Sequence, residues 1–459
     1  MDADLLMHDF PWRRLAQMRP DAVAIHTPAE TLSWRALAQR LDALCAGFQQ
    51  QGVQADMLVA LRGKNSLSLL LAWLALMQAG AAVLPLNPQL PPATLQPLLS
   101  TLRPDFMLNL ADALAESPAQ LALRSAALPP RRRWRPDAIA TLTLTSGSSG
   151  LPKAAAHDYR ALFASAAGVN QLMNFSADER WLLSLPLCHV SGQGIVWRWL
   201  LAGGGLAIPD AKTPLAQALA GCGFASLVPT QLWRLLQLPQ PPVGLKAVLL
   251  GGAAIPPELV ARAEAAGIRC WCGYGLTESA ATVCAKRADG QPGVGLPLAG
   301  REVRIVDEEI WIRGATLACG YWREGRPQPL TDAQGWFHTR DRGRWHRGEL
   351  QVLGRVDNLF FSGGEAIQPE SIESLLLQHP AVNQAFVLPQ QDEEWGARPV
   401  ALLALEAGWQ LTNVADWAQS RLASFQRPAR WLPLPEHLNE GGIKLSRQRL
   451  AQWLRAQSG

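Results

Sequence analysis

The sequence lacks the strong net charge that is typical of nucleic-acid-binding proteins. Its formal net charge is only +4 over 459 residues. A pI near 8.8 suits binding of anionic small molecules and is too weak a basic signal to indicate nucleic acid. One basic cluster, RRRWR at residues 131–135, has prolines on both sides and no second basic stripe after it. We therefore interpret this cluster as a solvated linker.

A disulfide framework is also missing. The chain has seven cysteines, an odd number without regular spacing, which predicts reduced thiols and a cytoplasmic protein. A single residue separates Cys270 and Cys272, and no Cys/His pair lies at zinc-site spacing, so we expect these two cysteines to pack in the core. The cysteines are Cys45, Cys188, Cys222, Cys270, Cys272, Cys284 and Cys319.

Long apolar segments are absent as well. The first residues, MDADLLMHDFPWRR, contain early acids and no apolar core, so no signal peptide is expected. The most apolar stretch, Leu67 to Leu86, is interrupted by polar residues, Gly80 and Pro85. It is too broken to cross a membrane and predicts a buried helix, a glycine C-cap and a short strand.

The sequence does contain the composition of a large globular protein. It is 48% hydrophobic and 17% charged, and 459 residues exceed what one simple core accommodates, so two or more domains are expected. Strand-like runs alternate with helical patterns from residue 21 to 312, which predicts βα units around mainly parallel sheets. The clearest runs are Ala81–Leu86, Ile139–Leu144, Trp181–Leu185, Ala225–Val228, Ala247–Leu250 and Arg269–Cys272.

This rhythm changes near residues 355–358, where a shorter, strand-rich region begins. The region continues through FFSGGEAIQPESIESLL and ends with a predicted helix at residues 446–456. We predict a domain boundary at the change, with residues 1–356 on one side and 357–459 on the other. From the residues alone, Asp357 could equally be an ordinary turn acid.

The segment LTLTSGSSGLPK, residues 142–153, has the composition of a phosphate-binding loop. Its glycines allow the backbone to approach an anion, its hydroxyls add donors and its lysine adds charge. Two residues separate the last glycine from the lysine, so this is not a Walker A motif. A flexible Ser/Gly linker is the alternative. The candidate residues are Thr145, Ser146, Gly147, Ser148, Ser149, Gly150 and Lys153.

This loop resembles the signature of the adenylate-forming enzymes, the superfamily of acyl-CoA synthetases, luciferases and peptide-synthetase adenylation domains. Four further segments resemble its remaining motifs, in the same order: GYGLTE at 273–278, TRDRG at 339–343, GRVDNLFFSGGE at 354–365 and GGIKLSR at 441–447. The resemblance implies an α/β fold with a large N-terminal domain of mainly parallel sheets. It also implies a small, mobile C-terminal α+β domain, with Asp357 as the hinge.

The resemblance implies ATP, Mg²⁺ and coenzyme A as ligands. Lys444 matches the catalytic lysine of the superfamily, although by itself it could be a surface lysine. Thr277 and Glu278 combine a hydroxyl with a carboxylate, which suits phosphate and magnesium, and Glu278 is the predicted metal ligand. Gly363 and Gly364 would leave room for the pantetheine arm of CoA, or form a simple turn.

The nucleotide side of the predicted site combines glycines with one aromatic ring. The stretch GGAA at residues 251–254, with Tyr274, would form the adenine slot, and a core tyrosine is the alternative. Asp341 would bind the ribose hydroxyls beside Arg355, unless both are surface charges. Arg340 stands where the superfamily usually has glycine. The predicted contacts are Gly251, Gly252, Ala253, Gly273, Tyr274, Gly275, Asp341 and Arg355.

Acyl specificity is predicted in SLPLCHVSGQGIVWRWLL, residues 184–201. His189 matches a gating position of the superfamily. Arg198 would lie on a helix without a carboxylate at spacings of three or four, so it either reaches solvent or pairs with an anionic ligand. Ser226 would add a neutral donor.

Several segments resemble members whose acid carries a second carboxylate. Activation of a different aryl or fatty acid, and a nucleotide-binding sensor without activity, are the alternatives, and the oligomeric state is left open.

Overall fold

The computed structural model describes most of the chain. The described residues are 8–90, 92–111, 118–127, 130, 134–145, 152–239, 242, 244–251, 255–362, 365–435, 438 and 445–457. Arg131, Arg132 and Arg133 of the basic cluster lie outside these ranges, whereas Arg135 forms an ion pair with Asp56. Among the described residues, no helix combines the length and the apolar character needed to cross a membrane.

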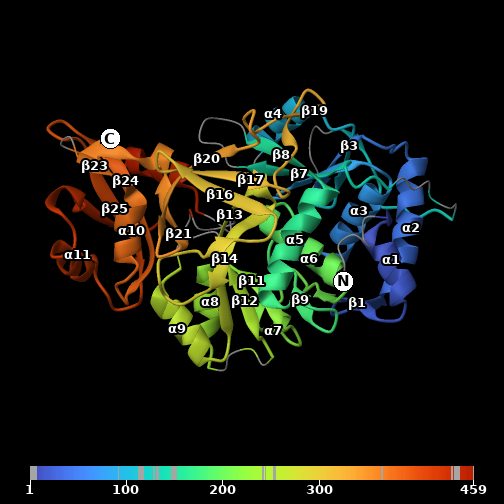
Figure 1. Ribbon diagram of the computed structural model, residues 1–459, viewed down its shortest axis with the longest axis horizontal. Coiled ribbons are helices and arrows are strands. Elements are labelled where there is room, and N and C mark those ends of the chain that lie inside the picture. Colours follow the sequence, from blue (N-terminus) through green and yellow to red (C-terminus); the bar gives the residue numbers. More distant parts are fainter. Residues whose placement is uncertain are drawn as a thin grey trace.

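Two large, mainly parallel sheets form the body of the molecule (Figure 1), as the alternating pattern predicted. The first has the order β15-β14-β13-β12-β11-β9-β10-β1-β2, with parallel pairing from β13 to β1. Its strands are β1 Val23–His26, β2 Thr31–Ser33, β9 Arg180–Leu182, β10 Gly205–Ala207, β11 Phe224–Leu227, β12 Ala247–Leu250, β13 Arg269–Leu276, β14 Ala281–Arg287 and β15 Leu296–Pro297.

The second large sheet has the order β19-β18-β8-β7-β4-β3-β5-β6. Strands β3 to β7 pair in parallel, and β7 turns back into β8 as an antiparallel hairpin. The strands are β3 Leu58–Arg62, β4 Ala82–Leu86, β5 Phe106–Asn109, β6 Ala119–Gln120, β7 Ile139–Thr145, β8 Lys153–Asp158, β18 Gly320–Arg323 and β19 Arg326–Gln328.

Helices fill the space between these sheets and cover their outer faces. Strand β12 shows why, because its side chains alternate: Ala247 and Leu249 face the inner core, whereas Val248 and Leu250 face the outer one. The inner helices are α1 Pro11–Met18, α2 Trp34–Gln50, α3 Leu67–Gln78, α5 Tyr159–Met173 and α6 Val190–Ala202. The outer helices are α4 Pro92–Leu102, α7 Leu215–Ala218, α8 Pro229–Leu236 and α9 Pro257–Ala265.

The predicted helix, C-cap and strand at residues 67–86 are confirmed as α3 and β4, with Gly80 at φ 92° between them. The predicted strand at 181–185 is shorter, because β9 ends at Leu182 and the chain leaves the sheet toward α6. In contrast, β13 extends beyond Cys272 to Leu276, because it pairs with β14 as a hairpin.

A four-stranded antiparallel sheet follows, with the order β16-β17-β20-β21, and leads to the last hundred residues. Those residues build their own cores from α10, α11, α12 and the sheet β24-β25-β26, at the orange and red end of Figure 1. The elements are β16 Arg301–Val306, β17 Glu309–Gly314, β20 Phe337–His346, β21 Glu349–Arg355, β22 Phe360–Ser362, β23 Glu365–Ile367, α10 Pro369–Leu376, β24 Val382–Asp392, β25 Gly396–Leu405, α11 Leu411–Gln419, β26 Arg430–Pro433 and α12 Arg447–Ala456.

Candidate active site

Predicted site residues gather where strands of both large sheets end. Thr145 closes β7 in the second sheet, while Ser226 lies near the end of β11 and Gly251 follows β12 in the first. The turn Thr277–Ser279 follows β13. Ligands of open α/β sheets bind outside the carboxyl ends of strands, so this convergence is the expected position for a site.

The phosphate side joins the two sheets through a tyrosine. Lys153 is the register partner of Thr145 across the β7-β8 hairpin. Its Nζ lies 4.9 Å from the ring centroid of Tyr321, and the Tyr321 hydroxyl donates to Glu278 Oε1 at 2.8 Å. Burial raises the pKa of Tyr321, and the Glu278 carboxylate raises it further, so the phenol remains a donor. A lysine, a phenol and a carboxylate therefore converge where β7 ends at Thr145 and β8 begins at Lys153.

The ribose side contains the predicted carboxylate in a defined network. Asp341 accepts a hydrogen bond from the Tyr274 hydroxyl at 2.6 Å and from Arg355 Nη1 at 3.3 Å. Tyr274 packs in a small core cluster, and burial and then the Asp341 carboxylate raise its pKa well above the ordinary value. Its hydroxyl thus orients Asp341, while stacking of its ring on adenine stays a prediction.

Arg340 adopts φ 61°, which explains why glycine suits this position. Its Nη2 donates to Asp357 Oδ1 at 2.8 Å, and Arg355 Nη2 donates to Asp357 Oδ2 at 3.3 Å. These guanidinium groups lower the pKa of Asp357, the predicted hinge. The departure from glycine therefore adds a second cation to the hinge carboxylate.

The described glycines of the predicted adenine slot differ in how closely other atoms surround them. A Cβ on Gly251 would meet none of the described residues within 4 Å. In the β13-β14 hairpin, a Cβ on Gly275 would lie 1.7 Å from the Ala281 carbonyl oxygen, and one on Gly273 would lie 2.8 Å from that of Cys284. The close approach of β14 thus requires glycine at both β13 positions.

Arg198 is the most unusual charge in the structure. It lies on α6, only 2% exposed, so it does not reach solvent. Its Nη1 donates to Ser226 Oγ at 3.1 Å, and its guanidinium lies 4.9 Å from the ring centroid of Trp181.

Burial lowers the pKa of Arg198, and Arg301 lowers it further, to about 9. Within the described ranges no carboxylate pairs with Arg198. A Cβ on Gly194 would come within 2.8 Å of Nη2, so glycine leaves the group room.

His189 occupies the loop between β9 and α6, as predicted, and is the residue before the helix begins. Asn65 braces this loop: its Nδ2 donates to the Leu185 carbonyl at 2.8 Å, and its Oδ1 accepts from the Leu187 amide at 3.0 Å. His189 and Arg198 thus belong to one continuous loop and helix.

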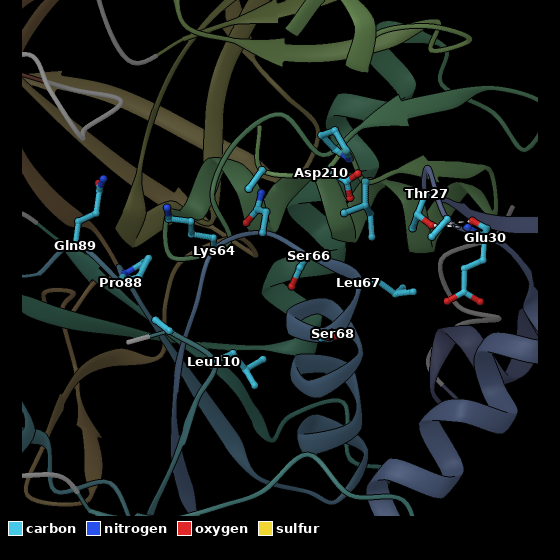
Figure 2. A pocket seen from close by; sticks show the side chains of 16 residues that line it. Thr27, Glu30, Lys64, Ser66, Leu67, Ser68, Pro88, Gln89, Leu110 and Asp210 are labelled. Carbon is cyan, nitrogen blue, oxygen red and sulfur yellow. Dashed lines mark hydrogen bonds between the residues drawn. The ribbon is translucent and has the colours of Figure 1, made fainter. Parts of the chain in front are cut away.

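A separate hollow of about 630 Å³ opens beside this loop (Figure 2). Lys64, Ser66 and Leu67 form one wall, Pro88 and Gln89 another, and Asn65 connects the hollow to the loop before His189. None of the described residues predicted for the site lines it. The hollow therefore adjoins the loop before His189 and does not include the predicted site residues that the structure describes.

Ten of the predicted site residues lie outside the described ranges, and their predicted roles stay predictions. They are Ser146, Gly147, Ser148, Ser149, Gly150, Gly252, Ala253, Gly363, Gly364 and Lys444.

Two residues of the site were missed by the sequence analysis. Tyr321 donates to Glu278 from 43 positions away, and Arg301, on β16, lowers the pKa of Arg198 on α6. No local spacing connects these pairs, because each partner lies on a different element. The only signal in the sequence was the residue type. An isolated tyrosine or arginine is too common for its type alone to identify a site residue.

The chain matches two family descriptions. One is the AMP-binding enzyme, over residues 12–322, and the other is the AMP-binding enzyme C-terminal domain, over residues 371–439. The chain therefore belongs to the AMP-binding enzymes, the adenylate-forming superfamily that the five motifs indicated.

Within that superfamily, the chain is similar to 2-succinylbenzoate–CoA ligases. The Salmonella typhimurium protein of that name is 54% identical over 97% of this chain and 98% of its own length. A solved arginine-to-lysine variant of Escherichia coli MenE with bound OSB-AMS is 51% identical, with a TM-score of 0.93 and coverage of 98% and 99%. The o-succinylbenzoate CoA synthetase from Bacillus subtilis, in complex with the acyl-adenylate intermediate OSB-AMP, is 25% identical, with a TM-score of 0.86 and coverage of 96% and 98%.

These relatives confirm a narrower resemblance that the sequence carries. The segment around Arg198, ASLVPTQLWRL at 225–235 and the segments 247–256 and 354–370 resemble o-succinylbenzoate–CoA ligase. Its aromatic acid carries two carboxylates, which is the kind of substrate that a buried, carboxylate-free arginine predicts.

Proposed function

We propose that this chain joins o-succinylbenzoate to coenzyme A at the expense of ATP, giving o-succinylbenzoyl-CoA, AMP and pyrophosphate, in menaquinone biosynthesis. The observation that carries the proposal is Arg198, a buried guanidinium whose described neighbours include a serine and a tryptophan ring but no carboxylate. Leaving such a charge unpaired costs several kcal/mol, about the effective penalty per buried ion. An anionic substrate group would offset that cost.

In the first half-reaction, the succinyl carboxylate attacks the α-phosphorus of ATP, and pyrophosphate leaves. Two anions meet in this step, so the site must neutralise charge in the transition state. Lys153 and the hydroxyls of the phosphate loop would hold the triphosphate, and Lys444 would stabilise the charge that develops at phosphorus. Thr277 would add a hydroxyl to the same group.

The residues present fit a magnesium ion. Mg²⁺ commonly takes one or two protein carboxylates and completes its coordination with phosphate oxygens and water. Glu278 supplies one carboxylate, already oriented by the Tyr321 hydroxyl, at the side of the site where Lys153 lies. Glu278 would hold the ion, which when bound neutralises phosphate oxygens.

On the nucleotide side, Asp341 would accept hydrogen bonds from the ribose hydroxyls, since Tyr274 and Arg355 already fix its orientation. The strand end at Gly251 would leave room for the flat adenine base, with Gly252, Ala253, Gly273 and Gly275 around it. This arrangement would position the α-phosphate for attack.

On the acyl side, Arg198 would pair with the ring carboxylate that does not react. The Ser226 hydroxyl already orients the guanidinium, and His189 would close the pocket at the start of α6. A guanidinium with two parallel donors recognises a planar carboxylate specifically.

In the second half-reaction, the CoA thiol attacks the acyl carbon of the adenylate, the thioester bond forms, and AMP and a proton leave. Asp357 would be the hinge between residues 1–356 and 357–459. Gly363 and Gly364 would line the thiol's approach. The seven free cysteines agree with a reducing, cytoplasmic location.

Pyrophosphate release with a panel of acids, each with and without CoA, tests the proposal. We expect o-succinylbenzoate to be the preferred acid and CoA to drive turnover to the thioester. Preference for a monocarboxylic aryl or fatty acid would overturn the substrate assignment. ATP binding without pyrophosphate release for any acid would indicate a sensor instead.

A further inference from the structure

The turn that carries Glu278 has a strained backbone. The 3₁₀ turn Thr277–Ser279 is followed by Ala280 at φ 49° and by Ala281, the first residue of β14, at φ 92°. Alanine disfavours this left-handed region, and two such residues in succession are costly. Surrounding contacts must therefore hold the turn in place.

One of those contacts comes from a helix more than a hundred residues away. Ser165, in the middle of α5, donates from its Oγ to the Ala280 carbonyl oxygen at 2.5 Å. Both residues are buried, with exposed fractions of 6% for Ser165 and 2% for Ala280. Water therefore cannot replace this donor, and the hydroxyl binds the first of the two strained residues.

The backbone of Ser165 is itself held from the other side. Arg301 donates to the Ser165 carbonyl from Nη2 at 3.0 Å and to the Thr282 carbonyl from Nε at 2.8 Å. The same guanidinium thus connects α5 to β14, directly after the strained pair. Hydrogen bonds from Ser165 and Arg301 therefore connect α5 with the backbone that follows Glu278.

A second set of hydrogen bonds holds the residues of the turn that precede Ala280. Ser279 Oγ and Thr316 Oγ1 lie 2.8 Å apart, and the Ala318 amide donates to the Glu278 carbonyl at 2.8 Å. These bonds hold the backbone of the turn between Thr277 and Ala280. The Ala280 amide donates to the Thr277 carbonyl at 3.2 Å, while the Ala280 carbonyl accepts from Ser165.

We propose that Ser165 is a positioning residue for Glu278: its hydroxyl fixes the left-handed Ala280–Ala281 turn that aims the Glu278 carboxylate at the magnesium ion bound with ATP. The inference rests on the proposed function for the identity of the ligand. Ser165 touches neither nucleotide nor acid, and acts through the turn. Without its hydroxyl, the turn relaxes toward ordinary backbone angles and the carboxylate moves.

The test measures ATP binding by calorimetry at a series of Mg²⁺ concentrations, with no acid present, for wild type, Glu278→Gln, Ser165→Ala and Thr141→Val. Thr141 is the matched control, because its buried hydroxyl also donates to a backbone carbonyl, that of Val83 at 3.0 Å, but does not contact the turn. Ser165→Cys keeps a weak donor of similar size and provides a graded variant that should fold if the alanine variant does not.

In wild type, Mg²⁺ should tighten ATP binding, and Glu278→Gln should abolish most of that effect. Ser165→Ala should raise the Mg²⁺ concentration needed for half of the effect by about tenfold, roughly the consequence of losing one oriented charged contact. Ser165→Cys should lie between Ser165→Ala and wild type, and Thr141→Val should match wild type even if its unfolding temperature falls equally.

If Ser165→Ala keeps the wild-type Mg²⁺ dependence, or if Thr141→Val loses as much, Ser165 has only a structural role. This experiment does not depend on the acid. Failure of the proposed substrate would appear separately, as missing pyrophosphate release by wild type with o-succinylbenzoate.

Discussion

Two buried arginines, Arg198 and Arg301, have no carboxylate partner among the described residues, and their surroundings differ. Arg301 donates to three backbone carbonyls, those of Ser165, Thr282 and Ala299, at 2.8 to 3.0 Å. In the described structure, Arg198 has one hydrogen bond, to Ser226, and the face of Trp181. Burial lowers the pKa of both groups, to about 10 for Arg301 and about 9 for Arg198.

This difference distinguishes a structural cation, Arg301, from a candidate for ligand binding, Arg198. The N–H groups of Arg301 already donate hydrogen bonds to carbonyls of α5, β14 and the segment before β16. A ligand at this position would therefore form few new hydrogen bonds. Arg198 faces a serine hydroxyl and an aromatic ring, and a glycine at position 194 keeps space beside Nη2. A buried charge with donors still to satisfy is the better candidate for a substrate contact.

The largest effect, a loss of stability, should follow from replacing Arg301. Arg301→Met leaves three buried carbonyls without their donor, so the free energy of unfolding should fall by about 3 kcal/mol or more. Urea unfolding measures it. The preference of the remaining folded enzyme for a dicarboxylic acid should persist. A loss no greater than that of Arg198→Met would remove the distinction between the two arginines.

Arg198→Lys should act on catalysis instead. A lysine cannot form two parallel bonds to a carboxylate, so kcat/KM for o-succinylbenzoate should fall at least about 100-fold, with ATP affinity near wild type. An analogue without the ring carboxylate is the control, because it should be a poor substrate for both proteins and lose little further in the variant. Equal losses for both acids would mean that Arg198 only supports the pocket.

Arg198→Met should stabilise the ligand-free protein by about 1–2 kcal/mol, because it removes a buried charge and keeps an unbranched, apolar side chain at that position. The folded pKa of Arg198 lies below its unfolded value, so the unfolded state binds more protons above pH 9 and wild type regains stability as pH rises further. Unfolding measured at pH 7 and pH 10 should show a smaller advantage of the variant at pH 10. An unchanged or growing advantage would contradict the assignment of the penalty to the charge.

The smallest effect should come from the serine that orients Arg198. Ser226→Ala removes one neutral hydrogen bond, so kcat/KM for o-succinylbenzoate should fall about fivefold, near 1 kcal/mol. Ser184→Ala is the matched control, because the Ser184 hydroxyl donates to the Ser226 carbonyl and does not contact Arg198. Identical losses in the two variants would assign the effect to the strand end rather than to the guanidinium.

The fold class, the order of the motifs and the local setting of Arg198 could be predicted from the residues alone. Alternating apolar runs define βα units because the side-chain period of a strand differs from that of a helix. The positions three and four residues from Arg198 contain no acid, so a helical neighbour could not pair it. Motifs such as GYGLTE are contiguous, so their chemistry is visible without a structure.

Three outcomes required the three-dimensional structure: whether Arg198 reaches solvent, which buried arginine already has its hydrogen-bond partners, and what holds Glu278. Those outcomes depend on contacts between distant segments: Ser226 is 28 positions from Arg198, Tyr321 is 43 from Glu278, and Ser165 is 115 from Ala280. A sequence constrains which side chains meet within a few turns of helix or strand. Burial and partners across elements follow from how whole sheets and helices pack, and that packing is not encoded in any one local pattern.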